Sequence, residues 1–264
     1  MQTFVLTAFV ALAVFLFLTA LFFFVLTRGA LILRSFSPQQ DAASHVYPIY
    51  SNMRLIKFVD YQPVISAILL FQYPRLVSRI VADLQRLNLA GKRMLITSCA
   101  FGNVIPRVVE AAVQSGTSEV LISDIVNNEL LNAQDKLQAF ESRIRYISDD
   151  ATAMQQPDAS VDVNVLFFLL HELPHPLKAK ALNEASRVLK PGGKLYIGEF
   201  HRPRIAVLRA FSWLYFKVFE PYGLALWDAE DPVNYLNSIG EWNVVRNTYF
   251  FSNYQMITAT KMSR

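Results

Sequence analysis

The chain has 264 residues, a formal net charge of +4 and one cysteine, Cys99. A single cysteine excludes an intramolecular disulfide, which fits a reducing compartment. The basic residues are diluted among apolar ones, so we expect no nucleic-acid partner. From Arg28 to Arg93, nine Lys/Arg stand against three Asp. A basic stretch of this kind is attracted to anionic lipid, so we expect membrane lipid to be a partner.

The first segment of the chain, from Phe4 to Thr27, contains no charged residue, no Pro and no Gly. A helix of about 20 apolar residues crosses a bilayer core of about 30 Å, so this segment is predicted to be one transmembrane helix. Arg28 and Arg34 follow it, and the positive-inside rule places them in the cytoplasm. We therefore expect a single-pass protein of the bacterial inner membrane, or of the equivalent mitochondrial membrane, with a cytoplasmic catalytic domain.

Two other interpretations of this segment remain open. A cleaved signal peptide would have a basic start and a shorter apolar run, whereas this chain begins Met1-Gln2-Thr3. A buried core helix would carry a polar face, which this run lacks. The predicted organisation is an anchor at 1–35, a linker and helical cap at 36–90, and a catalytic domain at 91–264.

Apolar strands alternate with amphipathic helices along the rest of the chain. A helix opens at Pro74 and ends near Gly91. Alternation of this kind predicts a mostly parallel sheet, whose ligands bind beyond the carboxyl ends of the strands. The predicted strands are 94–97, 120–123, 144–147, 161–168 and 194–200, the helices are 104–114, 128–140 and 178–189, and two closing strands lie within 242–260.

Carboxylates follow two of these strands. Asp124 follows the second strand, where an acidic residue can accept both ribose hydroxyls of a nucleoside. Asp150 follows the third strand, where it can accept an adenine amino group. Each residue alone would be weak evidence, because Asp at a strand end often only caps the next helix. In this order within one chain, they indicate a nucleoside site.

Three segments carry a resemblance to a known family. The runs Ser160-Val161-Asp162-Val163, Leu170-His171-Glu172 and Arg187-Val188-Leu189-Lys190-Pro191-Gly192-Gly193 resemble class I methyltransferases of the ubiquinone/menaquinone group, over about 90–264. The resemblance implies an α/β, Rossmann-like class I fold with a mostly parallel seven-stranded sheet, here preceded by the transmembrane helix. It also implies S-adenosylmethionine as cofactor, with contacts from Thr97, Ser98, Ala100, Gly102, Asp124, Ile125, Asp150, Ala151 and Phe167.

The first loop departs from the pattern of that family. Ile96 stands where an acidic residue is usual, Ser98 and Ala100 replace glycines, and Gly102 remains. This loop resembles the rhodoquinone-biosynthesis family (RquA). That resemblance implies that a ring methoxy group of ubiquinone is replaced by an amino group, with S-adenosylmethionine as amino donor and a divalent metal, Mn²⁺. Loss of the carboxylate favours a neutral, nucleophilic amine, because an acidic partner would stabilise the ammonium form.

Several His and Glu residues follow the fourth and fifth strands. The predicted catalytic residues are His171, Glu172 and His201, with His171 in proton transfer. Imidazole and carboxylate together suit manganese, so His171, Glu172, His175 and Glu199 are the candidate metal ligands. The alternative is structural: Glu172 and His175 would cap the following helix, and His201 would face solvent.

The segment from Arg204 to Phe219 is apolar nearly all round. It is predicted to be either a buried helix or a lid that dips into lipid and admits a prenylated ring. Two rival functions also remain, an ordinary quinone or lipid methyltransferase and a non-catalytic scaffold. Asp124 and Asp150 argue against the scaffold, and Ile96 argues against the ordinary methyltransferase. The oligomeric state is left open.

Overall fold

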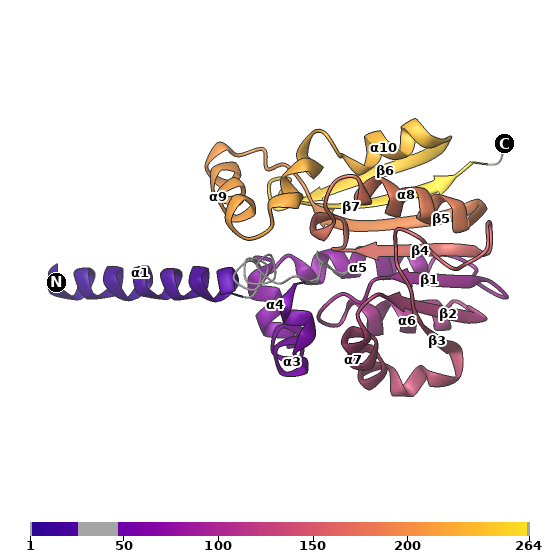
Figure 1. The fold of residues 1–264 in the computed structure, drawn as a ribbon, viewed down its shortest axis with the longest axis horizontal. Helices are drawn as coiled ribbons and strands as arrows, with labels where there is room; N and C mark the ends of the chain where they lie inside the picture. Colours follow the sequence, from indigo (N-terminus) through magenta and orange to yellow (C-terminus); the bar gives the residue numbers. More distant parts are fainter. Residues whose placement is uncertain (1, 26–46, 263–264) are drawn as a thin grey trace, which may run out of the picture.

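Seven strands form one sheet in the computed structural model, which describes residues 2–25 and 47–262 (Figure 1). The strand order is β3-β2-β1-β4-β5-β7-β6, and β7 alone runs antiparallel to its neighbours. The predicted Rossmann-like, mostly parallel, seven-stranded sheet is therefore confirmed. The strands are β1 (Arg93–Thr97), β2 (Glu119–Asp124), β3 (Ile144–Ser148), β4 (Val161–Phe167), β5 (Leu189–Phe200), β6 (Trp242–Tyr249) and β7 (Tyr254–Lys261).

Helices cover both faces of this sheet, because its strands are apolar on both sides. One apolar core joins the sheet to α5, α6 and α7, and a second joins it to α8 and α10. The chain leaves β1 toward β2 and β3, then returns to place β4 on the other side of β1. The carboxyl ends of β1 and β4 thus mark the switch point where ligands bind. The helices are α5 (Tyr73–Leu84), α6 (Val104–Gln114), α7 (Asn127–Leu137), α8 (Leu177–Val188) and α10 (Pro232–Ile239).

Short elements before α5 form a cap at this end of the sheet. They are η2 (Pro48–Ser51), α3 (Met53–Asp60) and α4 (Gln62–Ile68). Their buried side chains belong to the same core as β1 and α6. Asp60 ties the cap to its neighbours, because its Oδ1 accepts from the Gly102 amide at 2.9 Å and from Lys136 Nζ at 2.6 Å. The described part of the predicted 36–90 cap therefore packs as part of the catalytic domain.

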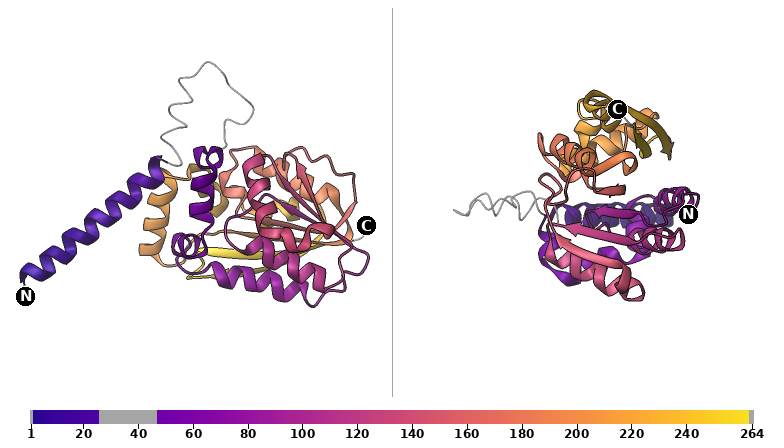
Figure 2. Two further views of the ribbon diagram at one scale, coloured as in Figure 1. Left: turned by 90° about the horizontal axis from the view of Figure 1, so that it is seen from below. Right: turned by 90° about the vertical axis from the view of Figure 1, so that its right-hand side faces the viewer.

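The N-terminal helix, α1 (Gln2–Phe24), projects from the cap end of the molecule (Figures 1 and 2). Its Phe22 ring meets the Phe58 ring of α3 edge-on, with centroids 6.0 Å apart. Among the described residues, Leu6–Phe22 form an apolar helix shorter than a bilayer span, and no single helix is long and apolar enough to cross a membrane. Only α4 and α5 together reach that length, as a pair bent by 104°. Arg28, Arg34 and the first part of the linker lie outside the described residues.

The remaining elements are one helix and three short helical turns. They are α9 (Ala206–Val218) and three short helical turns, η3 (Gln138–Arg143) before β3, η4 (Leu170–Glu172) after β4, and η5 (Pro221–Trp227) after α9. In α9 only Phe216 is fully buried, while Val207, Phe211 and Leu214 are exposed. Of the two interpretations of this segment, the buried helix is therefore wrong, because one of its faces meets solvent.

Candidate functional site

A polar cavity of about 60 Å³ lies at the carboxyl ends of β1, β2 and β3. Its walls come mainly from the three loops that follow these strands, which parallel strands bring to one edge of the sheet, and Tyr50 of the cap and residues after β4 complete them. Six of the nine predicted cofactor contacts line it: Thr97, Ser98, Asp124, Ile125, Asp150 and Ala151.

Asp124 is a buried carboxylate of the polar cavity. The Cys99 amide donates to its Oδ2 at 2.6 Å, and the Val126 amide donates to its Oδ1 at 2.8 Å. Burial raises its pKa to about 6, although these hydrogen bonds act in the opposite direction. The carboxylate thus organises the loop after β1 and still presents acceptor lone pairs to the cavity.

Asp149 and Asp150 have different roles in the loop after β3. Asp149 is buried and accepts from the Asp150 and Gln155 amides, so it shapes the loop. Asp150 lines the cavity, and its Oδ1 accepts from the Thr152 amide and hydroxyl, each at 2.8 Å. Among the described residues none donates a hydrogen bond to its Oδ2, which is the atom suited to an adenine amino group.

Ser98 keeps a glycine backbone conformation in the loop after β1. Its φ is +76°, in the left-handed region that favours glycine. Its hydroxyl bonds to Asp124, which lowers the pKa of that carboxylate. A serine therefore occupies a position shaped for glycine, held there by a partner across the cavity.

Other predicted contacts of the first loop lie away from the polar cavity. A Cβ on Gly102 would lie 2.7 Å from the Tyr73 hydroxyl, so this glycine allows close packing under α5 rather than lining a cavity. Ala100 and Phe167 line a second cavity, described next. Ile96 is buried against α6 and lines neither of these two cavities.

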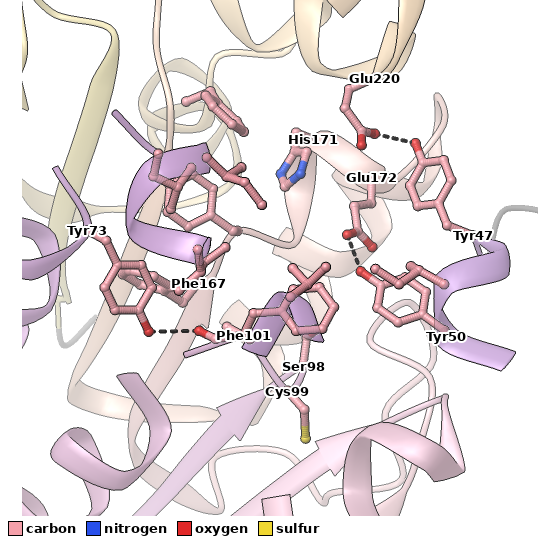
Figure 3. Close-up of a pocket in the computed structure, with 18 of the residues that line it drawn as sticks. Tyr47, Tyr50, Tyr73, Ser98, Cys99, Phe101, Phe167, His171, Glu172 and Glu220 are labelled. Atoms are coloured by element: carbon pink, nitrogen blue, oxygen red, sulfur yellow. Dashed lines mark hydrogen bonds between the residues drawn. The ribbon is translucent and has the colours of Figure 1, made fainter. Parts of the chain in front are cut away.

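A second, apolar cavity of about 120 Å³ lies beside the polar one (Figure 3). The cap, the loops after β1 and β4, the end of β5, and α9 all contribute to its walls. Tyr50, Ser98, Cys99 and Glu172 line both cavities, so the two meet at these residues. Its lining is mostly aromatic and aliphatic, with Tyr47, Ile49, Val59, Ile65, Ile68, Leu69, Tyr73, Ala100, Phe101, Phe167, Phe168, Phe200 and Tyr215 beside the polar His171 and Glu220.

Two tyrosines of the cap contact two carboxylates in the apolar cavity (Figure 3). The Tyr50 hydroxyl donates to Glu172 and the Tyr47 hydroxyl donates to Glu220, each at 2.5 Å. Burial raises the pKa of Glu172 to about 7; the nearby His171 and the Tyr50 hydrogen bond oppose this rise, and Glu220 adds to it. Glu172 can therefore gain or lose a proton near neutral pH, at the junction of the two cavities.

His171 is held by a carboxylate behind it. Glu199 is fully buried, and its Oε1 lies 3.1 Å from His171 Nδ1. It also accepts from the backbone amides of His171 and Phe200. Burial lowers the pKa of His171, but attraction to Glu199 outweighs it and raises the pKa to about 9. At neutral pH this imidazole is a cation and a proton donor, whereas Glu199 acts through it as a positioning residue.

The other two predicted histidines lie elsewhere. His175 is exposed and pairs with Glu230 outside both cavities. His201 donates from Nδ1 to the Ser252 carbonyl at 2.9 Å and lines a separate open hollow beside Arg246. The structure thus does not bring His201 to His171, because β5 carries it past the site toward β6 and β7. The alternative in which Glu172 and His175 cap α8 is wrong, since the N-cap of α8 has no side-chain hydrogen bond.

The candidate metal ligands do not converge. Within residues 2–25 and 47–262, no three His, Cys, Asp or Glu side chains are grouped so that they could hold an ion. His171 is paired with Glu199, Glu172 with Tyr50, and His175 with Glu230. The donors present in this arrangement therefore do not fit a manganese site, and no chemical step is assigned to one.

Sequence patterns missed four residues of the apolar cavity: Tyr47, Tyr50, Phe168 and Glu220. Tyr47 and Tyr50 lie in a short turn before α3, where no periodicity marks them. Glu220 follows α9 immediately, at the end of an apolar run. The one available signal was the pair of tyrosines around Pro48, in a segment otherwise taken for a linker.

Comparisons with known proteins place this site in a family context. The chain is 28% identical over 150 residues to a ubiquinone/menaquinone biosynthesis C-methyltransferase of Roseobacter denitrificans, covering 56% of this chain and 58% of that protein. It is 35% identical over 121 residues to the Shewanella oneidensis protein of the same name, covering 45% and 47%. The chain thus spans about half the length of the curated relatives it matches.

Solved structures share the fold. An O-methyltransferase family protein from Burkholderia thailandensis superposes with a TM-score of 0.56 at 15% identity, covering 76% of this chain and 60% of that one. A sequence model described as the ubiE/COQ5 methyltransferase family matches residues 56–243, well over half of the chain. With its class I sheet order and two joined cavities at the switch point, the chain belongs to the ubiE/COQ5 methyltransferase family.

Proposed function

We propose that this protein is an S-adenosylmethionine-dependent transferase that converts ubiquinone to rhodoquinone, replacing a ring methoxy group with an amino group. The observation that carries the proposal is the meeting of a polar, aspartate-lined cavity with an apolar, aromatic one at Glu172. Curated relatives are named for ubiquinone and menaquinone biosynthesis, which supports a prenylated quinone as substrate.

The polar cavity suits the cofactor. Asp124 faces the place where ribose hydroxyls would lie, and Asp150 faces the place for an adenine amino group. The left-handed Ser98 lets the loop backbone approach closely, as glycine does in related loops. When bound, S-adenosylmethionine supplies the amino nitrogen that replaces the methoxy oxygen, which leaves as methanol.

The apolar cavity suits a quinone ring. Its aromatic walls match a flat, apolar ring, and its few polar groups are grouped around His171, Glu172 and Glu220. We assign to Glu172 the proton that the attacking nitrogen loses, since its pKa of about 7 matches that role. We assign to His171 the proton that the departing methoxy oxygen gains, because its pKa of about 9 keeps it charged. One proton is taken and one is given, so the displacement of methanol is balanced. Release of the free amino group would then break the bond between that nitrogen and the methionine Cα, with two electrons passing to the quinone ring and water supplying the oxygen of the departing α-keto acid, so that the product would form as the quinol.

We further propose that α1 is a single-pass membrane anchor and that the catalytic domain is cytoplasmic. The uncharged, apolar run from Phe4 to Thr27 and the arginines after it support this topology. A reporter fused after Arg264 should give a cytoplasmic signal. A periplasmic or lumenal signal would refute the topology and leave the enzymatic proposal untouched.

Methyl transfer to a quinone ring is the second candidate, and the names of the curated relatives favour it. One experiment separates the two reactions. The purified full chain is incubated with ubiquinone and S-adenosylmethionine labelled with heavy nitrogen in the amino group, and in parallel with heavy carbon in the methyl group. Heavy nitrogen in the quinone product, found by mass spectrometry, supports amino transfer. Heavy carbon in a methylated quinone supports the second candidate instead.

A further inference from the structure

The outer face of α9 carries an exposed apolar stripe. Val207, Phe211 and Leu214 follow each other at positions i, i+4 and i+7, and their side chains are 65%, 68% and 54% exposed. This spacing places them on one side of the helix. The opposite side packs inward through Phe216, and Tyr215 lines the apolar cavity. The helix therefore separates that cavity from the surroundings, and it is apolar on both of its sides.

The turn between β6 and β7 extends this surface. Phe251 is 54% exposed, and its carbonyl accepts from the Arg204 amide at 2.8 Å, just before α9 begins. Phe251 therefore lies beside the first turn of the stripe. We call Val207, Phe211, Leu214 and Phe251 together the α9 ridge.

One basic residue lies beside the α9 ridge. Arg204 is exposed, and its amide donates to the carbonyl of Phe251, a member of the ridge. Arg209 is on the opposite side of α9 and lines an open hollow. Within the described part of the chain, no ion pair is found for Arg204. An apolar ridge with a cation beside it matches the acyl region and the phosphates of an anionic bilayer.

The position of α9 in the molecule points to the same partner. Figures 1 and 2 show α9 at the end of the molecule from which α1 projects. The side chains of α1 are apolar and largely exposed from Leu6 to Phe22. Two apolar surfaces from distant parts of the chain thus lie at one end, next to the cavity that Tyr215 lines.

We propose that the α9 ridge docks on an anionic lipid bilayer, with its apolar side chains at the acyl boundary and Arg204 against lipid phosphates. Docking places the wall of the apolar cavity against the membrane. Entry of a prenylated substrate past Tyr215 follows from this arrangement and rests on the proposed quinone activity. The docking itself does not depend on that activity.

The test uses the full chain, one molecule per lipid nanodisc, so that contact between two copies is absent. Phe211→Cys is labelled with an environment-sensitive fluorophore. Leu131→Cys on α7, at 50% exposure in the parent, is the matched control. Cys99 is buried, and the parent chain treated with the label gives the background. A blue shift and quenching by lipid-borne spin labels are expected at position 211 and absent at 131. Solvent-like emission at both positions would overturn the proposal.

Lipid composition tests the role of Arg204. In phosphatidylcholine discs with added phosphatidylglycerol, the shift at 211 should increase. Arg204→Gln should abolish that increase, whereas Arg209→Gln, on the opposite side of α9, should keep it. A fluorescence shift at position 211 that does not change with lipid charge in the parent would refute the assignment of Arg204.

Quinone conversion tests substrate entry past α9 separately from membrane docking. Phe211→Ser with Leu214→Ser should reduce conversion of a long-tailed quinone and spare a short-tailed one. An equal loss of conversion for the long-tailed and the short-tailed quinone would contradict substrate entry past α9. If the parent converts no quinone, the proposed function fails, while the fluorescence result still decides the docking.

Discussion

The two cavities are built in different ways. The polar cavity is formed mainly by the loops after β1, β2 and β3, which follow one another in the chain, and is completed by Tyr50 of the cap and by residues after β4. The apolar cavity takes its walls from the cap, η4, the end of β5 and α9, and joins side chains up to 173 residues apart, such as Tyr47 and Glu220. One sheet thus presents a site built mainly from neighbouring loops beside a site assembled from distant segments of the chain. Cofactor binding and substrate chemistry should therefore respond separately to substitutions.

The largest difference between the effect on turnover and the effect on cofactor affinity is expected for substitution of Glu172, where the two cavities meet. Glu172→Gln should lower turnover by roughly 10²–10⁴-fold, because a proton acceptor is lost. Affinity for S-adenosylhomocysteine should stay near the parental value, with Glu241→Gln as a surface control. In the parent, turnover should rise as pH increases through about 7, because Glu172 is protonated below that pKa. Parental turnover in Glu172→Gln would contradict its assigned role.

Asp124 tests the polar cavity alone. Asp124→Ala should weaken S-adenosylhomocysteine binding by about 1.5–3 kcal/mol, because a buried charged acceptor is removed. Calorimetry measures the affinity. The exposed Asp228→Ala serves as control, and thermal unfolding checks the loop that loses the acceptor for the Cys99 and Val126 amides. Unchanged affinity in a folded variant would refute the ribose assignment.

Tyr50 lies N-terminal to residues 56–243, the part that matches the family. Tyr50→Phe should lower turnover about tenfold, because a hydrogen bond to a charged group contributes about 1.5 kcal/mol. It should also move the acidic limb of the pH profile upward, since the Tyr50 hydrogen bond lowers the pKa of Glu172. The exposed Tyr61→Phe is the matched control. If turnover falls but the acidic limb of the pH profile does not move, Tyr50 contributes only packing and does not act on the pKa of Glu172.

The smallest effect is expected at Ser98. Ser98→Gly relieves a left-handed strain of about 1–2 kcal/mol, and the greater freedom of glycine in the unfolded chain and the lost hydroxyl bond to Asp124 together offset most of it. The free energy of unfolding should therefore change by less than about 1 kcal/mol. Ser98→Ala keeps the strain and loses the hydroxyl bond to Asp124, so urea titration should rank it below Gly. If Ser98→Ala is more stable than Ser98→Gly, backbone strain at position 98 does not limit the stability of this loop.

Much of the polar cavity could be predicted from local patterns. Asp124 and Asp150 each follow an apolar strand, and parallel strands carry their carboxyl ends to one edge. Gly102 was also singled out by its motif, but the structure shows it packing under Tyr73. A motif indicates that the backbone needs a small residue, and it does not reveal whether a cofactor or a side chain comes close.

The sequence by itself determined the sheet, its helices and the aspartates at its edge, because hydrophobic period and strand-end position are properties of short segments. Tertiary structure alone decided which histidine belongs to the apolar cavity. His171 and His201 both follow strands, yet only His171 lines it, whereas β5 carries His201 to the hollow beside Arg246. It also decided that Tyr47 and Tyr50 meet Glu220 and Glu172, since contacts between distant segments depend on how the cap packs on the sheet.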